Sequence, residues 1–338
     1  MAFRAGLRPL TATPGASDTF GLGCAPIGNL YRSVAESDAD ETVAAALGRG
    51  IRFFDTAPHY GAGASEARLG RALTGVHRDT VVIATKVGRR IVDASGETVT
   101  SGGVGVDTVG DLSRDGVLRS LEGSLSRLGT DRIDLLYLHD PVDVDEALAH
   151  AMPALAALRA EGVVRAIGVG MVWPEPLTRF VREADVDVVM IAGRTTLLDH
   201  RGETDLLPEA VRHGVGVIAA GVFNSGILAD PVGAPYFDYR EASPEQRARA
   251  LRLAAVCQCR GVPLRHVAAR YPLRLPAIGA VVIGARTAAE VEDFADAEHA
   301  EIPEDLWDEL TAERRLEPTV EHSLERDDVA RPAGAGRG

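Results

Sequence analysis

The sequence predicts an α/β protein in which eight parallel strands close into a (β/α)8 TIM barrel. Short apolar runs alternate with amphipathic stretches, and the unit recurs roughly every 25 to 35 residues. Near-continuous apolar runs are typical of parallel strands that helices cover on both faces. Such alternation indicates either an open doubly wound sheet or a closed barrel, and eight units in 338 residues favour the barrel.

Seven of the apolar runs are clear strand candidates, and an eighth is weaker. The clear candidates are residues 51–55, 81–86, 133–139, 164–170, 186–192, 215–221 and 280–285, and the weaker run is 20–26. Helix start signals lie between the runs, namely Ser37 three residues before Asp40, Ser113 before a pattern that ends at Gly129, and the triplet Ser243-Pro244-Glu245. No G-x-G-x-x-G motif follows the first strand, which argues against a Rossmann domain.

The length fits one large domain, and we expect residues 1–320 to form a single catalytic barrel. Two Gly-rich insertions, 88–112 and 222–242, follow strands and therefore lie where barrels place functional loops. The last residues, 322–338, read HSLERDDVARPAGAGRG, and we expect them to form a disordered tail.

Composition and charge argue against several classes of protein. The net charge of −13 disfavours partners such as nucleic acid or an anionic membrane surface. No stretch of eighteen apolar residues appears, and the N-terminus lacks a charged-then-apolar signal pattern, so we expect a cytoplasmic protein. Cys24, Cys257 and Cys259 cannot form a disulfide framework, and structural thiols are favoured over a metal site. A monomer and a homodimer both remain open.

The chain has a single lysine, Lys86, among its 36 Lys and Arg residues. It closes the apolar run VVIATK, at the point where a buried strand should end. A lysine in such a place is costly unless a carboxylate pairs with it. Genome composition explains part of the preference for arginine, but an ammonium is also a compact charge that fits beside a titrating group in a narrow site.

Polar residues close three neighbouring strands of the predicted barrel. Asp55 closes IRFFD, Lys86 closes VVIATK, and His139 closes IDLLYLH. Tyr60 lies five residues past Asp55, in the loop DTAPHYGAGASE. The C-terminal ends of barrel strands converge on one mouth, so we expect these four side chains to lie close together. Taken singly, His139 and Tyr60 are better explained by structural roles, but together with the lone lysine they indicate a site.

The chemistry of these four residues is coherent. Lys86 pairs with Asp55, which satisfies both buried charges. The same ammonium is expected to lower the pKa of the Tyr60 phenol from its usual value of about 10, toward the range useful for proton transfer. His139 would hold a substrate oxygen beside the tyrosine. The adjacent carbon then needs a hydride partner, which a nicotinamide supplies and a side chain does not.

Three motifs resemble the aldo-keto reductase family over about residues 15 to 315: FFDTAPHYGAGASEARLGRAL, the strand of Lys86, and LLYLH. The resemblance implies a (β/α)8 barrel with an Asp–Tyr–Lys–His catalytic tetrad, here Asp55, Tyr60, Lys86 and His139. The stretches DLSRDGVLRSLEGSLSRLGTDRIDLLYLHDP, AGRTTLLD and GVFNSGILA resemble the branch of L-fucose and D-threo-aldose 1-dehydrogenases. That branch oxidises cyclic hemiacetals to lactones with NAD(P)⁺, which implies Tyr60 as base in oxidation and as acid in reduction.

The loops after strands seven and eight are the usual phosphate site of such barrels. Backbone N–H groups from Phe223 to Gly226, and the helix start at Thr287, are placed to cradle a pyrophosphate. Together with the resemblance, this gives the expected cofactor-binding set: Gly170, Met171, Arg194, Thr195, Gly221, Phe223, Asn224, Ser225, Gly226, Leu228, Ile283, Gly284, Arg286 and Glu290.

The resemblance also bears on the choice between NAD and NADP. NADP-preferring relatives carry a basic residue on the helix after strand eight, where this chain has Glu290. A carboxylate repels a 2′-phosphate and accepts from ribose hydroxyls, so NAD is favoured. Arg286 is the counter-argument, because it either grips a 2′-phosphate or pairs with Glu290 four residues on.

The chain departs from the branch at two positions near the expected nicotinamide. Thr195 replaces a tyrosine that stacks on the ring, and Val172 replaces an asparagine that contacts the carboxamide. Each lost contact is worth about 1 kcal/mol, so cofactor binding would weaken about tenfold or more. Trp173 either supplies the missing aromatic face or packs on the barrel rim.

The leading hypothesis is therefore an NAD-linked dehydrogenase of sugar-like hemiacetals or alcohols, with NADP as the second choice of cofactor. An NADPH-dependent aldehyde or ketone reductase is the alternative within the same chemistry. The altered nicotinamide site also leaves open a nucleotide-binding or redox-neutral barrel, against which the intact tetrad argues. Tyr31, Arg89, Tyr236 and Tyr239 are candidates for contacts with the substrate, whose identity the sequence leaves open.

Overall fold

The computed structural model describes residues 17, 19–30, 32–99 and 106–315. The tail expected at 322–338 and the substrate candidate Tyr31 lie outside the described residues.

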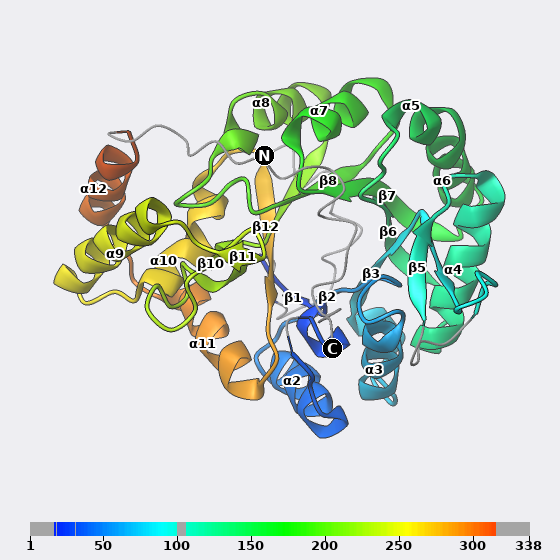
Figure 1. Ribbon diagram of the computed structural model, residues 1–338, viewed down its shortest axis with the longest axis horizontal. Coiled ribbons are helices and arrows are strands. Elements are labelled where there is room, and N and C mark those ends of the chain that lie inside the picture. The colour runs from blue at the N-terminus through cyan, green and yellow to red at the C-terminus, as the bar shows by residue number, and fades with distance from the viewer. Residues whose placement is uncertain (1–16, 18, 31, 100–105, 316–338) are drawn as a thin grey trace.

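The described residues contain a closed barrel of eight parallel strands, as the sequence predicts (Figure 1). Its strands are β1 (Phe20–Gly23), β2 (Phe53–Asp55), β3 (Val82–Val87), β6 (Ile133–His139), β7 (Val164–Met171), β8 (Val188–Ala192), β9 (Gly216–Ala220) and β12 (Ile278–Gly284). They follow one another around the ring in chain order, and β12 pairs with β1 to close it. All eight expected runs are confirmed as strands, including the weak run 20–26.

Alternate strand residues fill the barrel interior, because successive side chains of a strand point to opposite faces. The interior cluster consists of Val82, Ala84, Leu135, Tyr137, Ala166, Val188, Met190, Ile218, Ala280 and Val282, with Phe53 packed against it. Asp55, Lys86 and His139 each follow the last interior apolar residue of their strand by two positions, at or near the C-terminal end of the strand. Because side chains alternate between the two faces of a strand, these three also point toward the barrel axis. The strand period therefore brings these polar side chains to one mouth.

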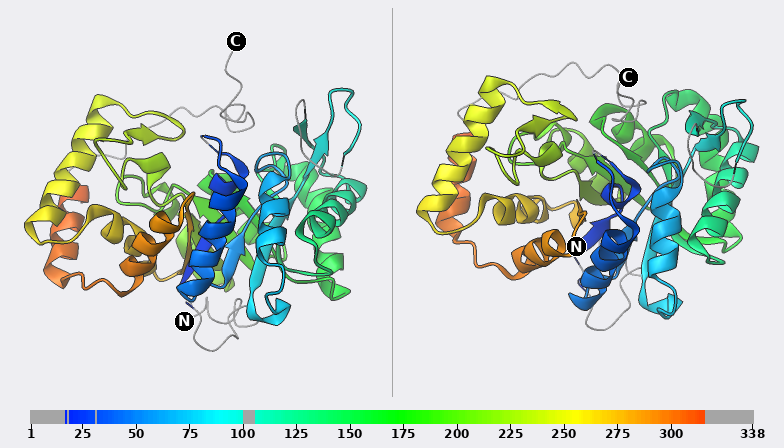
Figure 2. Two further views of the ribbon diagram at one scale, coloured as in Figure 1. Left: turned by 90° about the horizontal axis from the view of Figure 1, so that it is seen from below. Right: turned by 60° about the horizontal axis from the view of Figure 1, so that its bottom comes forward.

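Helices surround the barrel, as the two further views show (Figure 2). They are α2 (Glu36–Gly48), α3 (Ala64–Ala72), α4 (Arg114–Leu128), α5 (Val144–Glu146), α6 (Met152–Ala160), α7 (Pro174–Glu183), α8 (Leu206–His213), α9 (Pro244–Cys259), α10 (Leu264–Arg270), α11 (Ala288–His299) and α12 (Glu304–Arg315). A π-helical turn, η3 (Ala147–Ala151), joins α5 to α6. Short 3₁₀ helices are η1 (Pro26–Gly28), η2 (Arg78–Thr80), η4 (Arg201–Glu203), η5 (Asn224–Gly226) and η6 (Tyr271–Arg274).

Two of the three expected helix starts are confirmed. The Ser113 hydroxyl accepts from the Gly116 N–H at 3.0 Å and caps α4, which ends before Gly129 at a left-handed φ of 62°. Ser243 and Gln246 form a reciprocal capping box at the start of α9. The Ser37 signal is misplaced, because α2 begins at Glu36 after Ala35 and has no side-chain cap.

The two Gly-rich insertions contain hairpins that the sequence did not predict. In the first, β4 (Arg89–Val92) pairs antiparallel with β5 (Asp107–Gly110). In the second, β10 (Tyr236–Phe237) pairs with β11 (Arg240–Glu241). Both insertions follow barrel strands and rise on the same side of the barrel (Figure 2). They therefore stand beside the mouth that carries the polar residues.

A second hydrophobic cluster lies outside the barrel and supports the loops after β8 and β9. It joins Leu197 and Leu198, from the first loop, and Ile227 and Leu228, from the second, to apolar residues of α9, α10 and α12. Ile227 and Leu228 are fully buried in this cluster, so their packing holds in place the loop that is expected to bind the cofactor.

Candidate active site

Lys86 and Asp55 form a buried ion pair at the barrel mouth, from the ends of adjacent strands β3 and β2. The Lys86 Nζ donates to Asp55 Oδ1 at 2.9 Å, to Asp55 Oδ2 at 2.7 Å and to the Thr56 carbonyl at 2.9 Å. The two residues are 2% and 3% exposed. Burial raises the pKa of Asp55, and the Lys86 ammonium opposes that rise. The expected partner of the lone lysine is therefore present, and all three ammonium protons are used.

Tyr60 is half-buried and lies against the same ammonium. The Lys86 Nζ is 4.8 Å from the centroid of the Tyr60 ring. The expected lowering of the phenol pKa is nevertheless wrong: burial first, then the negative charges of Asp55 and Asp140, raise the pKa of Tyr60 well above 10. The reason is that Asp55 neutralises the ammonium and Lys86 donates to acceptors other than the phenol. The resting form of Tyr60 is thus a neutral phenol.

His139 ends β6 beside Tyr60, with ring centroids 5.7 Å apart in an edge-to-face arrangement. Burial, followed by the charges of Lys86 and Arg89, lowers the pKa of His139 well below 6.5, so the imidazole is neutral. Its Nδ1 is buried and has no hydrogen-bond partner among the described residues. The Nε2 lies 3.6 Å from Asp140 Oδ2. A neutral imidazole beside Tyr60 is suited to hold a substrate oxygen through a ring nitrogen.

Sequence reasoning did not identify His59, Asp140 or Cys24 as neighbours of this site. The His59 ring lies 5.8 Å from that of His139, and its Nδ1 is 2.6 Å from Thr108 Oγ1 on β5. Burial and the charge of Arg89 lower the pKa of His59 to about 4. In the sequence, only the position of His59 next to Tyr60 pointed to a role at this site. Its contact with Thr108 becomes visible only in the fold of the first insertion.

Asp140 follows His139 in a left-handed conformation, with a φ of 41°. Burial raises the pKa of the Asp140 carboxyl to about 6, and a hydrogen bond from the Val172 N–H opposes that rise. Cys24 is fully buried, and burial together with the charge of Asp55 raises the pKa of its thiol. At neutral pH, Asp140 is therefore ionised while Cys24 is a neutral thiol.

Arg89 is one of the candidate substrate contacts that the sequence suggests. Its charge affects the pKa values of His59, His139 and Asp140. It is 8% exposed and begins β4, directly after Gly88, which has a φ of 93°. Its Nε is buried without a hydrogen-bond partner among the described residues. The other two candidates, Tyr236 and Tyr239, are 50% and 48% exposed on the second insertion.

Gly170 and Met171 end β7 next to this mouth. A Cβ added at Gly170 would lie 3.8 Å from Lys86 Cε, in ordinary van der Waals contact, so there is room for about a methyl group beside the ion pair. Val172 is buried, and Trp173 packs against the barrel core at the start of α7. Of the two alternatives for Trp173, packing on the barrel is the one observed.

Arg194 and Thr195 are buried in the loop after β8. The Arg194 Nη1 donates to Asp238 Oδ1 at 2.8 Å, while its Nε and Nη2 have no partner in the described part of the chain. Thr195 is fully buried, and its Cγ2 would lie 3.0 Å from a Cβ at Gly202. Arg194 thus ties this loop to the second insertion, and Thr195 packs inside the loop.

The loop after β9 carries several left-handed residues in close succession: Gly221 (φ 61°), Asn224 (46°), Ser225 (63°) and Gly226 (120°). The Asn224 amide bridges to the previous loop, donating to the Gly193 carbonyl at 3.0 Å and accepting from Thr196 at 2.6 Å. Strained, tightly held turns of this kind are common where a loop receives a ligand. The backbone N–H groups of Asn224 and Gly226 already donate to carbonyls within the loop. Fewer N–H groups than expected are therefore left to bind a pyrophosphate.

The loop after β12 leads into α11, whose N-cap is Thr287. Gly284 is required there, because a Cβ would lie 2.9 Å from Pro26 Cγ, and the preceding Ile283 is buried. Glu290 accepts from both the Arg286 backbone N–H at 2.7 Å and its Nη2 at 2.9 Å. The expected pairing of Arg286 with Glu290 is therefore present.

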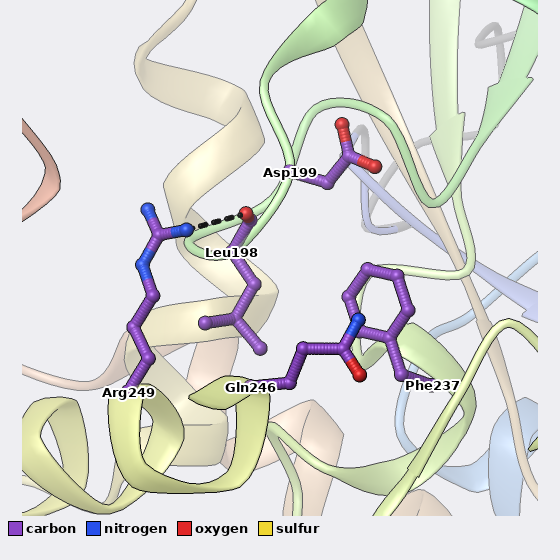
Figure 3. Close-up of a pocket in the computed structure, with 5 residues that line it drawn as sticks. All are labelled: Leu198, Asp199, Phe237, Gln246 and Arg249. Carbon is purple, nitrogen blue, oxygen red and sulfur yellow. Dashed lines mark hydrogen bonds between the residues drawn. The ribbon is translucent and has the colours of Figure 1, made fainter. Parts of the chain in front are cut away.

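A separate small cavity of about 10 Å³ lies below the second insertion, lined by Leu198, Asp199, Phe237, Gln246 and Arg249 (Figure 3). The Arg249 Nη1 donates to the Leu198 carbonyl across it at 3.2 Å. That volume suits about one water molecule. The cavity contains none of the four residues at the mouth.

Two absences hold for the described ranges. No group of three or more His, Cys, Asp or Glu side chains is arranged there to hold a metal ion. No helix within the same ranges is long and apolar enough to span a membrane.

Comparisons with known proteins agree with this geometry. A family model described as the aldo/keto reductase family matches residues 19–314. A D-threo-aldose 1-dehydrogenase from Pseudomonas sp is 43% identical over 328 residues, covering 92% of this chain and 98% of the relative. A pyridoxal 4-dehydrogenase from Microbacterium luteolum is 38% identical, with coverages of 87% and 93%.

Solved structures show the same architecture. An aldo-keto reductase from Bacillus halodurans, in its holo form, superposes with a TM-score of 0.74 at 26% identity, covering 94% of this chain and 98% of that one. A glycerol dehydrogenase from Gluconobacter oxydans superposes with a TM-score of 0.73 at 26% identity, covering 93% and 96%. The chain therefore belongs to the aldo/keto reductase family, whose enzymes use nicotinamide cofactors, and it is an oxidoreductase.

Proposed function

We propose that this enzyme is an NAD-linked dehydrogenase of sugar-like hemiacetals, with residues 1–320 as a single catalytic barrel. In the oxidation, the hydride leaves the hemiacetal carbon and the hydroxyl proton leaves the oxygen, so a C=O bond forms and the product is a lactone. The observation that carries the proposal is the buried Lys86–Asp55 pair under Tyr60, in a chain 43% identical to a D-threo-aldose 1-dehydrogenase.

Tyr60 is the proposed proton donor and acceptor at the substrate oxygen. Lys86 and Asp55 keep a neutral but strongly polar pair against its ring, which preorganises the site without adding net charge. Neutral His139, whose ring lies edge-to-face with that of Tyr60, would hold the same oxygen through a ring nitrogen. A bound nicotinamide supplies or accepts the hydride, which none of these side chains does.

The residues at the mouth fit such a cofactor. Gly170 leaves room beside Lys86, and the start of α11, next to the positive-φ loop from Gly221 to Leu228, would supply backbone donors for phosphates. We therefore retain Gly170, Met171, Gly221, Phe223, Ser225, Gly226, Ile283, Gly284, Arg286 and Glu290 as proposed cofactor contacts. Arg194, Thr195, Asn224 and Leu228 would shape the loops from within, because each is buried there.

NAD is the proposed cofactor rather than NADP. Glu290 holds the Arg286 guanidinium, so the one cation in this pair is already neutralised by a carboxylate. A 2′-phosphate would have to displace that carboxylate and would be repelled by it.

A reductase of aldehydes or ketones is the second candidate. It is favoured by the raised pKa of Tyr60, because a neutral phenol is ready to donate a proton to a carbonyl oxygen. Oxidation of an aldose and reduction of a carbonyl would use the same four residues. The two candidate functions therefore differ only in the substrate and in the direction of the reaction at neutral pH.

The test is an absorbance assay at the NADH band with purified enzyme. Each cofactor, oxidised or reduced, is combined with a panel of aldoses and with simple aldehydes and ketones. We expect NAD⁺-dependent oxidation of one or more aldoses by the wild type and loss of at least 1000-fold in kcat in Tyr60→Phe, about the share that general acid–base catalysis supplies. Absence of turnover with every combination would remove the proposal, and turnover of carbonyls alone would favour the reductase.

A further inference from the structure

Neither ring nitrogen of His139 is held by a hydrogen bond among the described residues. Its Nδ1 is buried without a partner, and its Nε2 lies 3.6 Å from Asp140 Oδ2, which is beyond hydrogen-bond distance. The χ2 torsion of a histidine has broad, roughly two-fold preferences, so the side chain alone does not set the direction of its ring. The orientation of this imidazole therefore depends on the groups that pack against it.

Two aromatic rings from the loop after β2 lie against His139. The Tyr60 ring is 5.7 Å away between centroids, at an interplanar angle of 89°, and the His59 ring is 5.8 Å away, at 73°. Both contacts are edge-to-face, a geometry that aromatic pairs prefer. Since these two rings restrict the rotation of the His139 ring, the orientation of His139 depends on how firmly they are held.

His59 is fixed by the hairpin of the first insertion. Its Nδ1 lies 2.6 Å from Thr108 Oγ1 on β5. Burial, together with the charge of Arg89, lowers the pKa of His59 to about 4, so its imidazole is neutral at pH 7. A hydroxyl both donates and accepts, so Thr108 can bond either tautomer of that imidazole. The ring of His59 is thus tied at one nitrogen to the hairpin while it packs against His139.

The hairpin itself is docked on the loop that carries His59 and Tyr60. Ile91 on β4 stands directly opposite Thr108, and opposed residues of an antiparallel pair point to the same face. Ile91 is 3% exposed, and its Cδ1 would lie 3.0 Å from a Cβ at Gly63, in the same loop as His59. One face of the hairpin therefore places Ile91 and Thr108 against this loop.

We propose that Thr108 and His59 are positioning residues for His139. The hydrogen bond from the hairpin fixes the His59 ring, and the edge-to-face contact holds the His139 imidazole in the orientation that binds the substrate oxygen. The inference rests on the proposed function, which assigns that oxygen to His139. It makes the first insertion part of the catalytic machinery, through contacts that run from Thr108 to His59 to His139.

The central variant is Thr108→Val, which removes the hydroxyl and keeps a β-branched side chain that suits a strand. With NAD⁺ and an aldose that the wild type oxidises, we expect kcat to fall about 5- to 10-fold, the effect of one hydrogen bond. KM should change by less than about twofold, because the lost bond does not touch the substrate. Thr108→Ser keeps the hydroxyl and should retain kcat within about twofold. A wild-type kcat in Thr108→Val would overturn the inference.

Thr98→Val is the matched control. It makes the same substitution in the same insertion and removes a hydrogen bond of the same length, from Arg90 Nη1 to Thr98 Oγ1 at 2.6 Å. That bond does not involve His59, so kcat should stay at the wild-type value, and circular dichroism should show that all variants are folded. An equal loss in Thr98→Val and Thr108→Val would overturn the inference, because the hairpin would then act only through its general stability.

A double-mutant cycle tests whether Thr108 acts through His59. His59→Phe keeps an aromatic ring but has no nitrogen for Thr108, so it removes the same hydrogen bond from the other partner. In that background, Thr108→Val should lower kcat by less than about twofold further, because the bond is already absent. The full loss in both backgrounds would show that Thr108 acts by another route, against the inference.

Nuclear magnetic resonance separates this inference from the proposed function. In the full-length protein with isotope-labelled histidine, the ring signals of His139 report its surroundings without turnover or cofactor, and His139→Gln identifies them. Thr108→Val should shift or broaden these signals, while Thr108→Ser and Thr98→Val should leave them as in the wild type. That pattern supports the positioning role even if no aldose is oxidised. Unchanged His139 signals in Thr108→Val contradict it, even if the enzyme is an active aldose dehydrogenase.

Discussion

The Nζ of Lys86 lies 4.8 Å from the centroid of the Tyr60 ring, yet its protons go to Asp55 and to the Thr56 carbonyl. The ammonium therefore lies close to the Tyr60 ring, while its hydrogen bonds go to acceptors other than the phenol oxygen. Its charge is balanced by Asp55 before it can act on the hydroxyl. The pair supports Tyr60 in place, while the protonation state of Tyr60 is decided by burial and by the nearby carboxylates.

Lys86→Met should destabilise the protein as well as remove activity. The substitution leaves the Asp55 carboxylate buried without its partner, which costs about 3 to 5 kcal/mol. The free energy of unfolding, from urea denaturation at pH 7, measures the loss. The double variant Asp55→Asn/Lys86→Met is the control, because it removes both charges and should recover at least half of the lost stability. A double variant no more stable than Lys86→Met would show that the pair is not what stabilises the mouth.

The oxidation rate should rise with pH because Tyr60 must lose its proton to act as a base. Its pKa is raised, so the phenolate is scarce at neutral pH and increases about tenfold for each pH unit. We expect kcat for aldose oxidation to climb from pH 7.5 to pH 10, while carbonyl reduction stays flat. Measurements begin at pH 7.5 because Asp140 titrates near 6. An oxidation rate that is already constant below pH 8 would contradict the raised pKa.

His59 should make the fold sensitive to acid. Its pKa is about 4 in the folded protein and 6.5 as a free side chain, so between these values the unfolded chain binds more protons. Stability is then lost as the pH falls through that window, by on the order of 3 kcal/mol. Asp140 acts in the opposite sense, because its folded pKa of about 6 lies above 3.8.

The difference between wild type and His59→Gln isolates the histidine, since the Asp140 contribution is common to both. Unfolding free energies are compared at pH 7, 6, 5 and 4.5. The wild type should lose its advantage over the variant as the pH falls. A difference that is independent of pH would show that His59 titrates normally.

Glu290→Gln should move cofactor preference toward NADP. The change removes the carboxylate that holds Arg286 and leaves the guanidinium able to bind a 2′-phosphate. We expect the ratio of kcat/KM for NADP to that for NAD to rise about tenfold. Arg265→Gln, at a surface pair with Asp293, is the control and should leave the ratio unchanged. If Glu290→Gln leaves it unchanged too, the pair does not face the ribose.

Local sequence patterns were sufficient to predict the barrel and to single out the four residues at its mouth. Each barrel strand is an uninterrupted apolar run, because a parallel strand is buried on both faces wherever it occurs. Asp55, Lys86 and His139 were identifiable because a polar residue at the end of such a run has a defined position in a barrel, whatever the rest of the chain does. The Ser113 and Ser243 caps are likewise local, since each satisfies N–H groups within its own first turn.

What the sequence by itself determined was therefore the eight-stranded barrel and the residues at its mouth, because strand period and strand ends are properties of short stretches. Only the tertiary structure decided the direction of the Tyr60 pKa, the hairpins of the two insertions, and the contact of His59 with Thr108. The physical reason is that burial, charge balance and loop geometry depend on groups brought together from distant parts of the chain. Lys86 shows both contributions. The sequence indicated its position and its pairing with Asp55, whereas its hydrogen bond to the Thr56 carbonyl is known only from the structure.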